Sequence, residues 1–375
     1  MNKFDAVIAG GGVIGASIAL ELAEAGMKVG VYDAREPGRE ASWASAGIIS
    51  PAPESREMIP FVPMRAASAA LYPDFIRKVE ELAGMNAGYR RDGALEAIFA
   101  GVNEEELNAV IALQHEVGLK AEMVSAEDAR RMEPALAEEM KAAIFRPDEA
   151  SVDNRALTEA VLTAAHRKGV RISAGNRVRA LWKEGKRCKG LMLEKGQAEA
   201  KWTIVAAGCY SAQIEGVAPY APVFPAKGQM IALRCDAVEI KRVLWLENTY
   251  LVPRNDGRII AGSTIERGVF DHDVTAGGMR QILNEAIKLA SGLEKARIEE
   301  TWAGLRPDSP DHLPIIGPTD TEGLLIATGH FRSGILLAPI TARLIREWVS
   351  TKKVSVDWEN VSPMRFGKAK RGQSA

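Results

Sequence analysis

The pattern of apolar residues at the start of the chain predicts a strand, a glycine-rich turn, a helix and a second strand. Residues 4–9 (FDAVIA) are a short apolar run of the kind that is buried in a parallel sheet. After the glycines a helical apolar pattern continues to Ala23, and Gly26 is placed as the stop of that helix. Residues 28–32 predict the second strand, which ends on Asp33.

The predicted turn has the spacing G-x-G-x-x-G at Gly10, Gly12 and Gly15. Gly10 permits a tight turn, Gly12 lets a pyrophosphate approach the backbone, and Gly15 allows close packing of helix and strand. The helix N-terminus adds unpaired N–H groups and positive potential. Asp33 is placed to accept hydrogen bonds from an unphosphorylated ribose, which favours FAD or NAD. Glycine clusters also make ordinary turns, but the ordered elements around this one favour a dinucleotide site.

The rest of the chain distinguishes between these two dinucleotides. A nicotinamide enzyme would continue with strands and helices in alternation, whereas residues 38–51 are mostly small. Small residues suit a backbone that passes close to a flat, bulky ligand, although a flexible loop is the alternative. Apolar runs at 202–208 and 324–329 predict two further buried strands, and a long helical pattern follows residues 330–334 (HFRSG).

Four segments carry a family resemblance, and they span nearly the whole chain. They are GGGVIG (10–15), EASWASAGIISP (40–51), TWAGLRPDSPDHLPIIG (301–317) and GHFRSGILLAP (329–339). The segments resemble the FAD-dependent oxidases related to D-amino-acid oxidase and sarcosine oxidase. Within that family they are most similar to the glycine oxidase branch, which supplies iminoglycine for the thiazole of thiamine biosynthesis.

The resemblance implies an α/β fold with two interleaved domains. One is a Rossmann-like FAD-binding domain with a mostly parallel sheet covered by helices, and the other is an α+β substrate domain with an antiparallel sheet. The expected segments are 1–80, 147–217 and 300–375 for the FAD-binding domain, and 81–146 and 218–299 for the substrate-binding domain. Within the first insertion, Asn103 and Ser125 are predicted to cap two helices.

FAD is the cofactor that the resemblance implies, and it is expected to be bound non-covalently. Some relatives attach the flavin through a cysteine near the last motif, but none of the three cysteines here lies beyond residue 235. The five histidines show no HExxH or HxxxH spacing, so no metal is expected. The residues expected to line the FAD site are Gly10, Gly12, Val13, Ile14, Gly15, Asp33, Ser42, Ala46, Gly47, Val178, Ala207, Gly208, His330, Phe331, Arg332, Ser333, Gly334 and Ile335.

Three residues are expected to act on the substrate: Tyr250, Arg306 and Arg332. The guanidinium of Arg306 suits a carboxylate held by two parallel hydrogen bonds. The resemblance implies that Tyr250 holds the same carboxylate and that Arg332 borders both flavin and substrate. From the residues alone, Arg306 could equally be an arginine paired with a neighbouring aspartate, and Tyr250 a half-buried tyrosine of a sheet.

Two positions depart from the pattern of the glycine oxidase branch. Ile265 stands where a methionine lines the pocket, and Asn248 stands where a histidine lies near the substrate. With Ile265 and Tyr250 in its wall, the pocket is expected to be small. These changes leave the exact substrate open.

The composition of the chain limits the kinds of partner that it is expected to bind. The 48 basic and 49 acidic residues give a net charge of −1 without basic blocks, which argues against nucleic acid as a partner. No run approaches the ~18 apolar residues of a membrane span, so no membrane partner is expected. The three separated cysteines fit a reducing cytoplasm. A homo-oligomer stays possible.

The reaction implied by the resemblance is oxidative deamination of glycine or another small amino acid or amine. Hydride transfer to FAD gives an imine or 2-oxo acid and ammonia, and molecular oxygen is reduced to hydrogen peroxide. One alternative is a D-amino-acid dehydrogenase, or a sarcosine or proline oxidase, that passes electrons to another acceptor. A more distant alternative is a flavin module that acts on modified tRNA.

Overall fold

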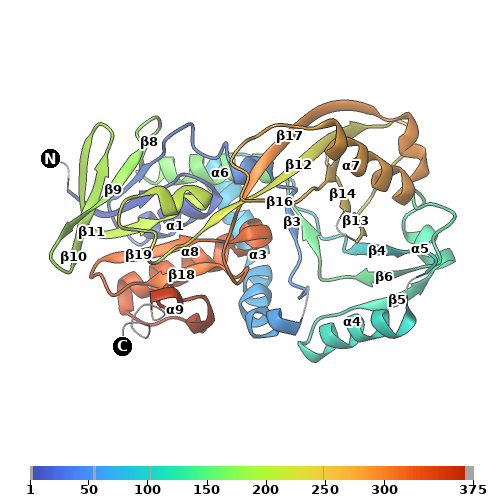
Figure 1. The fold of residues 1–375 in the computed structure, drawn as a ribbon, viewed down its shortest axis with the longest axis horizontal. Helices are drawn as coiled ribbons and strands as arrows, with labels where there is room; N and C mark the ends of the chain where they lie inside the picture. The colour runs from blue at the N-terminus through green and yellow to red at the C-terminus, as the bar shows by residue number, and fades with distance from the viewer. Residues whose placement is uncertain (1–2, 54–55, 102, 248, 368–375) are drawn as a thin grey trace.

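Two mixed sheets, each covered by helices, lie side by side in the protein (Figure 1). The computed structural model describes residues 3–53, 56–101, 103–247 and 249–367. The first sheet lies on the left of Figure 1 and contains eight strands from the described part of the chain. In spatial order they are β18 (Ile315–Pro318), β19 (Leu324–Thr328), β11 (Gly196–Val205), β1 (Phe4–Ala9), β2 (Val29–Tyr32) and β8 (Arg171–Ser173), with β10 (Arg187–Leu193) and β9 (Val178–Glu184) continuing from β11.

Five neighbouring strands of the first sheet, from β19 to β8, are all parallel. Ala6 and Ile8 of β1 face a core formed with helices, while Val7 and Ala9 face a second core on the other side. Burial on both faces explains why β1 is a continuous apolar run and not an alternating one. The helices of the first core are α1 (Val13–Glu24), α3 (Val62–Ala83), α6 (Asn154–Arg167) and α8 (Gly334–Thr351).

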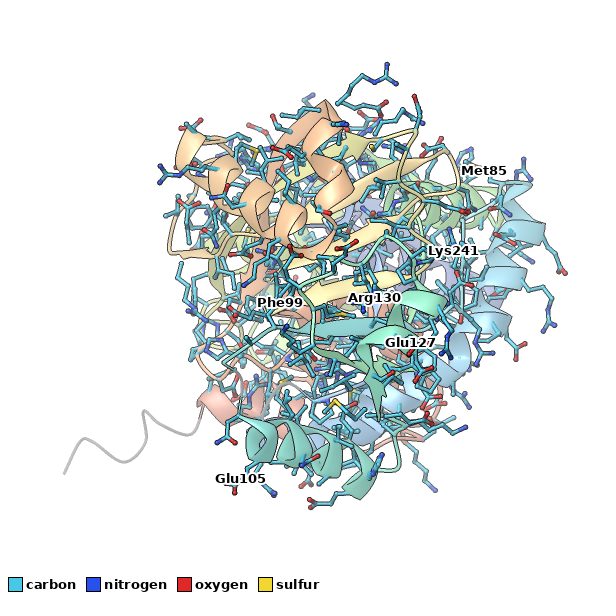
Figure 2. The ribbon with its side chains drawn as sticks, turned by 90° about the vertical axis from the view of Figure 1, so that its right-hand side faces the viewer. Met85, Phe99, Glu105, Glu127, Arg130 and Lys241 are labelled. Atoms are coloured by element: carbon cyan, nitrogen blue, oxygen red, sulfur yellow. The ribbon has the colours of Figure 1, made fainter. Side chains whose placement is uncertain are left out.

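The second sheet is built mainly from antiparallel pairs, although β13 and β4 run parallel. Its strands are β16 (Glu266–Arg267), β12 (Phe224–Arg234), β15 (Arg258–Gly262), β14 (Thr249–Pro253), β13 (Val243–Leu246), β4 (Ala94–Ile98), β6 (Ala142–Arg146), β5 (Glu122–Ser125) and β17 (Arg297–Asp308). Its helices are α4 (Glu104–Glu116), α5 (Ala126–Met132) and α7 (Ala276–Leu289). Figure 2 views the molecule from this end, with Glu105 on α4 and Glu127 and Arg130 on α5.

Short elements connect these layers. They are α2 (Ala41–Ala44), the pair β3 (Ile48–Ile49) and β7 (Ala150–Ser151), α9 (Met364–Gly367), and 3₁₀ turns at Arg56–Phe61, Gly208–Gln213, Ser291–Lys295, Phe331–Ser333 and Glu359–Val361.

The structure confirms the predicted fold class. The two helix caps predicted in the first insertion are present as well: the Asn103 side chain accepts a hydrogen bond from the Glu105 N–H at 2.9 Å, and Ser125 Oγ accepts one from the Asp128 N–H at 3.1 Å. The exact domain boundaries stay a prediction. They assign most of β17 to the FAD-binding segments, whereas β17 pairs with β12 in the second sheet.

A proline inside α8 is accommodated by two side chains from α3. Pro339 has no N–H, so the Ile335 carbonyl one turn earlier lacks its usual helical donor. The Tyr72 hydroxyl donates a hydrogen bond to that carbonyl. Ser68 Oγ donates to the Leu336 carbonyl and accepts from the Ile340 N–H at 3.4 Å. These contacts fix the first turns of α8 against α3.

Replacing Tyr72 with phenylalanine is expected to lower the free energy of unfolding by about 1–3 kcal/mol, because the buried Ile335 carbonyl loses its donor. The substitution Pro339→Ala restores an N–H at the position that normally serves this carbonyl. In the Pro339→Ala background, Tyr72→Phe should therefore lower the free energy of unfolding by less than it does in the wild type. Urea unfolding of the two single variants and the double variant measures this difference. An equal cost in both backgrounds would contradict this account.

Candidate active site

The glycine-rich turn at the end of β1 is shaped by close backbone contacts. Gly10 has φ +102°, and a Cβ on it would lie 2.4 Å from the Ala206 carbonyl oxygen. Both the angle and the contact exclude a larger residue. A Cβ on Gly15 would lie 2.0 Å from the Gly10 carbonyl oxygen. Gly15 therefore allows α1 to pack on the turn, as the sequence predicted.

The N-terminus of α1 is open toward a cavity. The N-cap residue is Gly12, which has no side chain to occupy the helix end. The Val13 N–H donates to Ser42 Oγ at 2.9 Å, so α2 is tied to the first turn of α1. The helix end provides positive potential for an anionic group such as a pyrophosphate.

Asp33 at the end of β2 braces the glycine turn. Its Oδ2 accepts a hydrogen bond from the Gly11 N–H at 2.7 Å, and its Oδ1 accepts one from the Arg35 N–H at 2.9 Å. The carboxylate also lines the cavity. Each carboxylate oxygen has a second lone pair, so Asp33 keeps the capacity to accept from a ribose hydroxyl.

A cavity of about 820 Å³ runs from the glycine turn to the second sheet. It brings together residues that lie far apart in the sequence. The predicted site residues in its wall are Gly10, Gly12, Val13, Ile14, Asp33, Ser42, Ala46, Gly47, Val178, Ala207, Gly208, Tyr250, Arg306, His330, Phe331, Arg332, Ser333, Gly334 and Ile335. Gly15 is the exception among the predicted residues, because it packs against Gly10 and does not line the cavity. The individual roles of these residues stay predictions.

The wall of this cavity fits FAD in its chemistry. The open helix end and the Asp33 carboxylate match a pyrophosphate and a ribose, and most of the residues from the 40–51 segment that line the cavity are small. At the other end the first turn of α8, beginning at Gly334, contributes positive potential next to His330 and Arg332. A cavity of this volume is within the range of cofactor sites.

Two titratable groups in the wall are held neutral by burial. Burial raises the pKa of the Cys209 thiol to about 12, so this cysteine is not a reactive thiolate at neutral pH. Burial lowers the pKa of His330 to about 3, and its Nε2 lies 3.1 Å from Thr341 Oγ1. Neither group supplies a charge to this site near pH 7.

Arg306 of β17 lies at the second-sheet end of the cavity and is partly buried. One guanidinium nitrogen donates to Ser263 Oγ at 2.6 Å, and the other donates to the Thr264 carbonyl at 3.4 Å. Among the described residues, no carboxylate oxygen lies within 4.0 Å of this guanidinium. The alternative of an arginine paired with a neighbouring aspartate is therefore not what the structure shows.

The electrostatic surroundings of Arg306 favour an anion. Burial lowers the pKa of its guanidinium; Tyr250 opposes this shift, and the positive charge of Arg332 adds to it. Tyr250 is 9% exposed, and its hydroxyl donates to Met230 Sδ at 3.4 Å. A carboxylate placed between the two arginines would offset their mutual repulsion.

Sequence reasoning did not identify Ser263 and Thr264, which hold Arg306, or the buried Glu149 in the cavity wall. Ser263 and Thr264 are ordinary polar residues after a strand, and no motif marks them. Glu149 follows Asp148 in a turn between two short strands, a position typical of an exposed acid. Only the folded structure shows that Ser263 and Thr264 contact Arg306 and that Glu149 contacts Trp245.

The expectation that Ile265 narrows the pocket is wrong. Its side chain is 37% exposed and does not belong to the cavity wall, because the segment before β16 presents it outward. Asn248, the other departure from the family pattern, lies outside the described residues. Of the two residues expected to keep the pocket small, Tyr250 alone lines the cavity.

Across the described ranges, no helix combines the length and the apolar character needed to cross a membrane. The same part of the chain contains no cluster of three or more histidine, cysteine or acidic side chains placed to hold a metal ion.

Comparison with known proteins agrees with the geometry. Residues 5–348 match the model of the family described as FAD dependent oxidoreductase (DAO). The chain is 35% identical over 369 residues to the bifunctional protein ThiO/ThiG of Synechocystis sp., with 96% of the chain but 54% of that protein covered. It thus spans about half the length of these bifunctional relatives.

Proteins of similar length are found as well. A glycine oxidase of Geobacillus kaustophilus is 30% identical, with 95% of each chain covered. The crystal structure of glycine oxidase from that organism has a TM-score of 0.93 at 29% identity, and covers 97% of this chain and 99% of its own. The resemblance predicted from the four sequence segments is confirmed. The chain belongs to the FAD dependent oxidoreductase (DAO) family.

Proposed function

We propose that this protein is an oxidase of glycine or another small amino acid or amine, with molecular oxygen as the electron acceptor. The observation that carries this proposal is Arg306, a partly buried guanidinium in the cavity wall that is bonded to two uncharged oxygens. Tyr250 and Arg332 line the same cavity. The glycine oxidases among the relatives support this choice of substrate.

The chain's residues bind and orient the substrate. Arg306 would hold the carboxylate with two parallel charge-assisted hydrogen bonds, and the hydroxyl of Tyr250, which interacts with Arg306 in the same wall, would add a third donor. FAD, the cofactor of this family, supplies the hydride acceptor when bound. With the α-carbon held in this way, its hydrogen can leave as a hydride, so no protein base has to remove a proton from carbon. The positive potential at the N-terminus of α8 would stabilise the negative charge that a reduced cofactor gains.

The proposal is tested on purified protein loaded with FAD. Glycine, sarcosine and D-alanine are offered in turn, while oxygen consumption and hydrogen peroxide are measured. The expected result is peroxide formation with at least one of these substrates. Reduction of an artificial dye without oxygen uptake would instead indicate a dehydrogenase. Salt-dependent binding of RNA in a shift assay, with no amine oxidised, would favour a tRNA-modifying module.

FAD is expected to be released intact when the protein is precipitated with acid. Of the three cysteines, Cys209 is the one that lines the cavity, and its buried thiol is protonated at neutral pH. A covalent link to the flavin is therefore not expected. The measurement is the flavin absorbance of the supernatant, and absorbance that stays with the pellet would contradict the prediction.

We also propose that the protein works in the cytoplasm and contributes an imine to thiamine biosynthesis. The three free cysteines, Cys188, Cys209 and Cys235, fit a reducing compartment. The ThiO/ThiG relatives support the pathway.

A further inference from the structure

The cavity continues past Tyr250 into a polar side chamber on the second sheet. We define the side chamber by Glu96, Gln114, Arg146, Glu149 and Trp245, all of which line the cavity. Trp245 pairs with Tyr250 on the neighbouring strand, and their rings meet edge to face at 5.3 Å. Glu96 pairs with Trp245 on the next strand. The chamber is thus continuous with the residues proposed to hold the substrate.

Glu149 is a buried carboxylate in this chamber whose hydrogen-bond partners are neutral. It is 3% exposed. Its Oε1 accepts from the Ser50 hydroxyl at 2.7 Å, and its Oε2 accepts from the Trp245 indole N–H at 3.1 Å. Among the described residues no cationic nitrogen lies within 4.0 Å of it.

The nearest arginine in the sequence does not pair with Glu149. Arg146 instead forms an ion pair with Glu96 and donates to Gln114 Oε1 at 3.3 Å. Among the described residues that define the chamber there are thus two carboxylates and one guanidinium, and the guanidinium pairs with Glu96 and not with Glu149. Arg65 lies in the adjoining wall, where it is buried and donates to the Ser50 carbonyl at 2.8 Å rather than to Glu149, whereas Glu247 on the same wall is exposed.

A cation on a bound ligand would give the Glu149 carboxylate the charged partner that the described residues do not supply within 4.0 Å. Burial raises the pKa of Glu149, because the charged carboxylate loses water; Arg146, Ser50 and Trp245 oppose the shift and Glu96 adds to it. An ammonium beside Glu149 would replace the lost water contacts, and the carboxylate still has lone pairs to accept its N–H groups. The aromatic ring of Trp245 adds a second favourable surface for a cation.

The chamber is also accessible. Val110 of α4 lines the cavity and is 39% exposed, so the cavity reaches the surface beside the chamber.

We propose that the side chamber is a substrate subsite for an ammonium group carried by the substrate beyond its reacting amine, and that Glu149 determines this specificity. The proposal rests on the proposed function: Arg306 holds the carboxylate at one end, and Glu149 receives the ammonium at the other. The preferred substrates are then N-substituted glycines whose substituent ends in a primary amine. Glycine carries no second amine and would make no use of the chamber.

The test compares two substrates of equal length on the FAD-loaded enzyme. N-(2-aminoethyl)glycine ends in an ammonium, and N-propylglycine ends in a methyl group. Loss of a hydride and a proton from the glycine unit gives an imine, which water splits into glyoxylate and 1,2-diaminoethane or propylamine. The two electrons and two protons that the substrate loses reduce one oxygen molecule to hydrogen peroxide, with FAD supplying the electron acceptor when bound. Glyoxylate formation therefore reports kcat/KM for both compounds.

The ammonium compound is expected to have a kcat/KM at least about tenfold higher, as one hydrogen bond to a charged group would give. In Glu149→Gln this ratio should fall to within about threefold. Glu122→Gln, an exposed glutamate on β5 of the same sheet, is the matched control and should keep the wild-type ratio.

Each outcome decides the question. A wild-type ratio of one or less overturns the proposal without any variant, and so does oxidation of glycine with neither longer compound accepted. An unchanged ratio in Glu149→Gln overturns the role of that residue. If glycine, sarcosine and both longer compounds all fail to react, the proposed function itself is wrong.

Discussion

Replacing Arg306 with alanine is expected to lower kcat/KM for a carboxylate-bearing substrate by about two to four orders of magnitude. The guanidinium lies in the cavity wall with only uncharged partners among the described residues. Its loss would leave the substrate carboxylate buried without its counter-charge, and a broken buried pair costs roughly 3–5 kcal/mol. Steady-state oxygen uptake measures the effect, and the Kd for FAD should remain unchanged.

Three controls make the Arg306 experiment selective. Arg306→Lys should recover only part of the activity, because an ammonium keeps the charge but not the two parallel hydrogen bonds. Arg297→Ala removes an exposed arginine from the same strand and should have little effect. A small amine without a carboxylate should be a poor substrate for both wild type and Arg306→Ala. If both kinds of substrate lose activity equally, Arg306 has a structural role.

Asp33→Ala is expected to raise the Kd for FAD by roughly 10- to 150-fold, or about 1.5–3 kcal/mol. The substitution removes an acceptor for the ribose and also the carboxylate that holds the Gly11 N–H. The glycine turn would therefore be less well ordered for the pyrophosphate. Titration of the apoprotein with FAD, followed by flavin fluorescence, gives the Kd. Turnover of the fully loaded variant should change little.

A second carboxylate provides the control for Asp33. Asp5 accepts a hydrogen bond from the Lys28 N–H at 2.8 Å and so also links β1 to the start of β2, but at the opposite end of the strands. Asp5→Ala should leave the Kd for FAD unchanged. Normal FAD binding by Asp33→Ala would show that its carboxylate is not the ribose ligand.

The parts of the fold that the sequence predicted are those set by local interactions. The strand at 4–9 and the caps Asn103 and Ser125 depend on residues within a few positions of one another, and the structure has them where the pattern indicated. The glycine spacing of the turn was also readable. Gly10 and Gly15 lie so close to neighbouring backbone that a side chain is excluded, and Gly12 is the N-cap of α1.

The parts that could not be predicted depend on contacts between distant segments. Tyr72 donates a hydrogen bond to a carbonyl of α8 that is 263 residues away, and Glu149 accepts one from Trp245, which is 96 residues away. Neither partner has a sequence pattern that selects it. The resemblance to the family carried the expectation for Ile265, but the exposed path of the backbone before β16 turned its side chain away from the cavity.

The strand order of the first sheet also has a consequence during synthesis on the ribosome. β1 is made first, yet it lies between β2 and β11, and β11 follows roughly 190 residues later. At a synthesis rate of about 5–20 residues per second, the edge of β1 that pairs with β11 stays unpaired for roughly 10–40 s. Over that interval the nascent chain exposes an apolar strand edge, which favours aggregation or capture by a chaperone. Shortened translation products that end before β11 should therefore be insoluble, although they contain the entire glycine-rich turn.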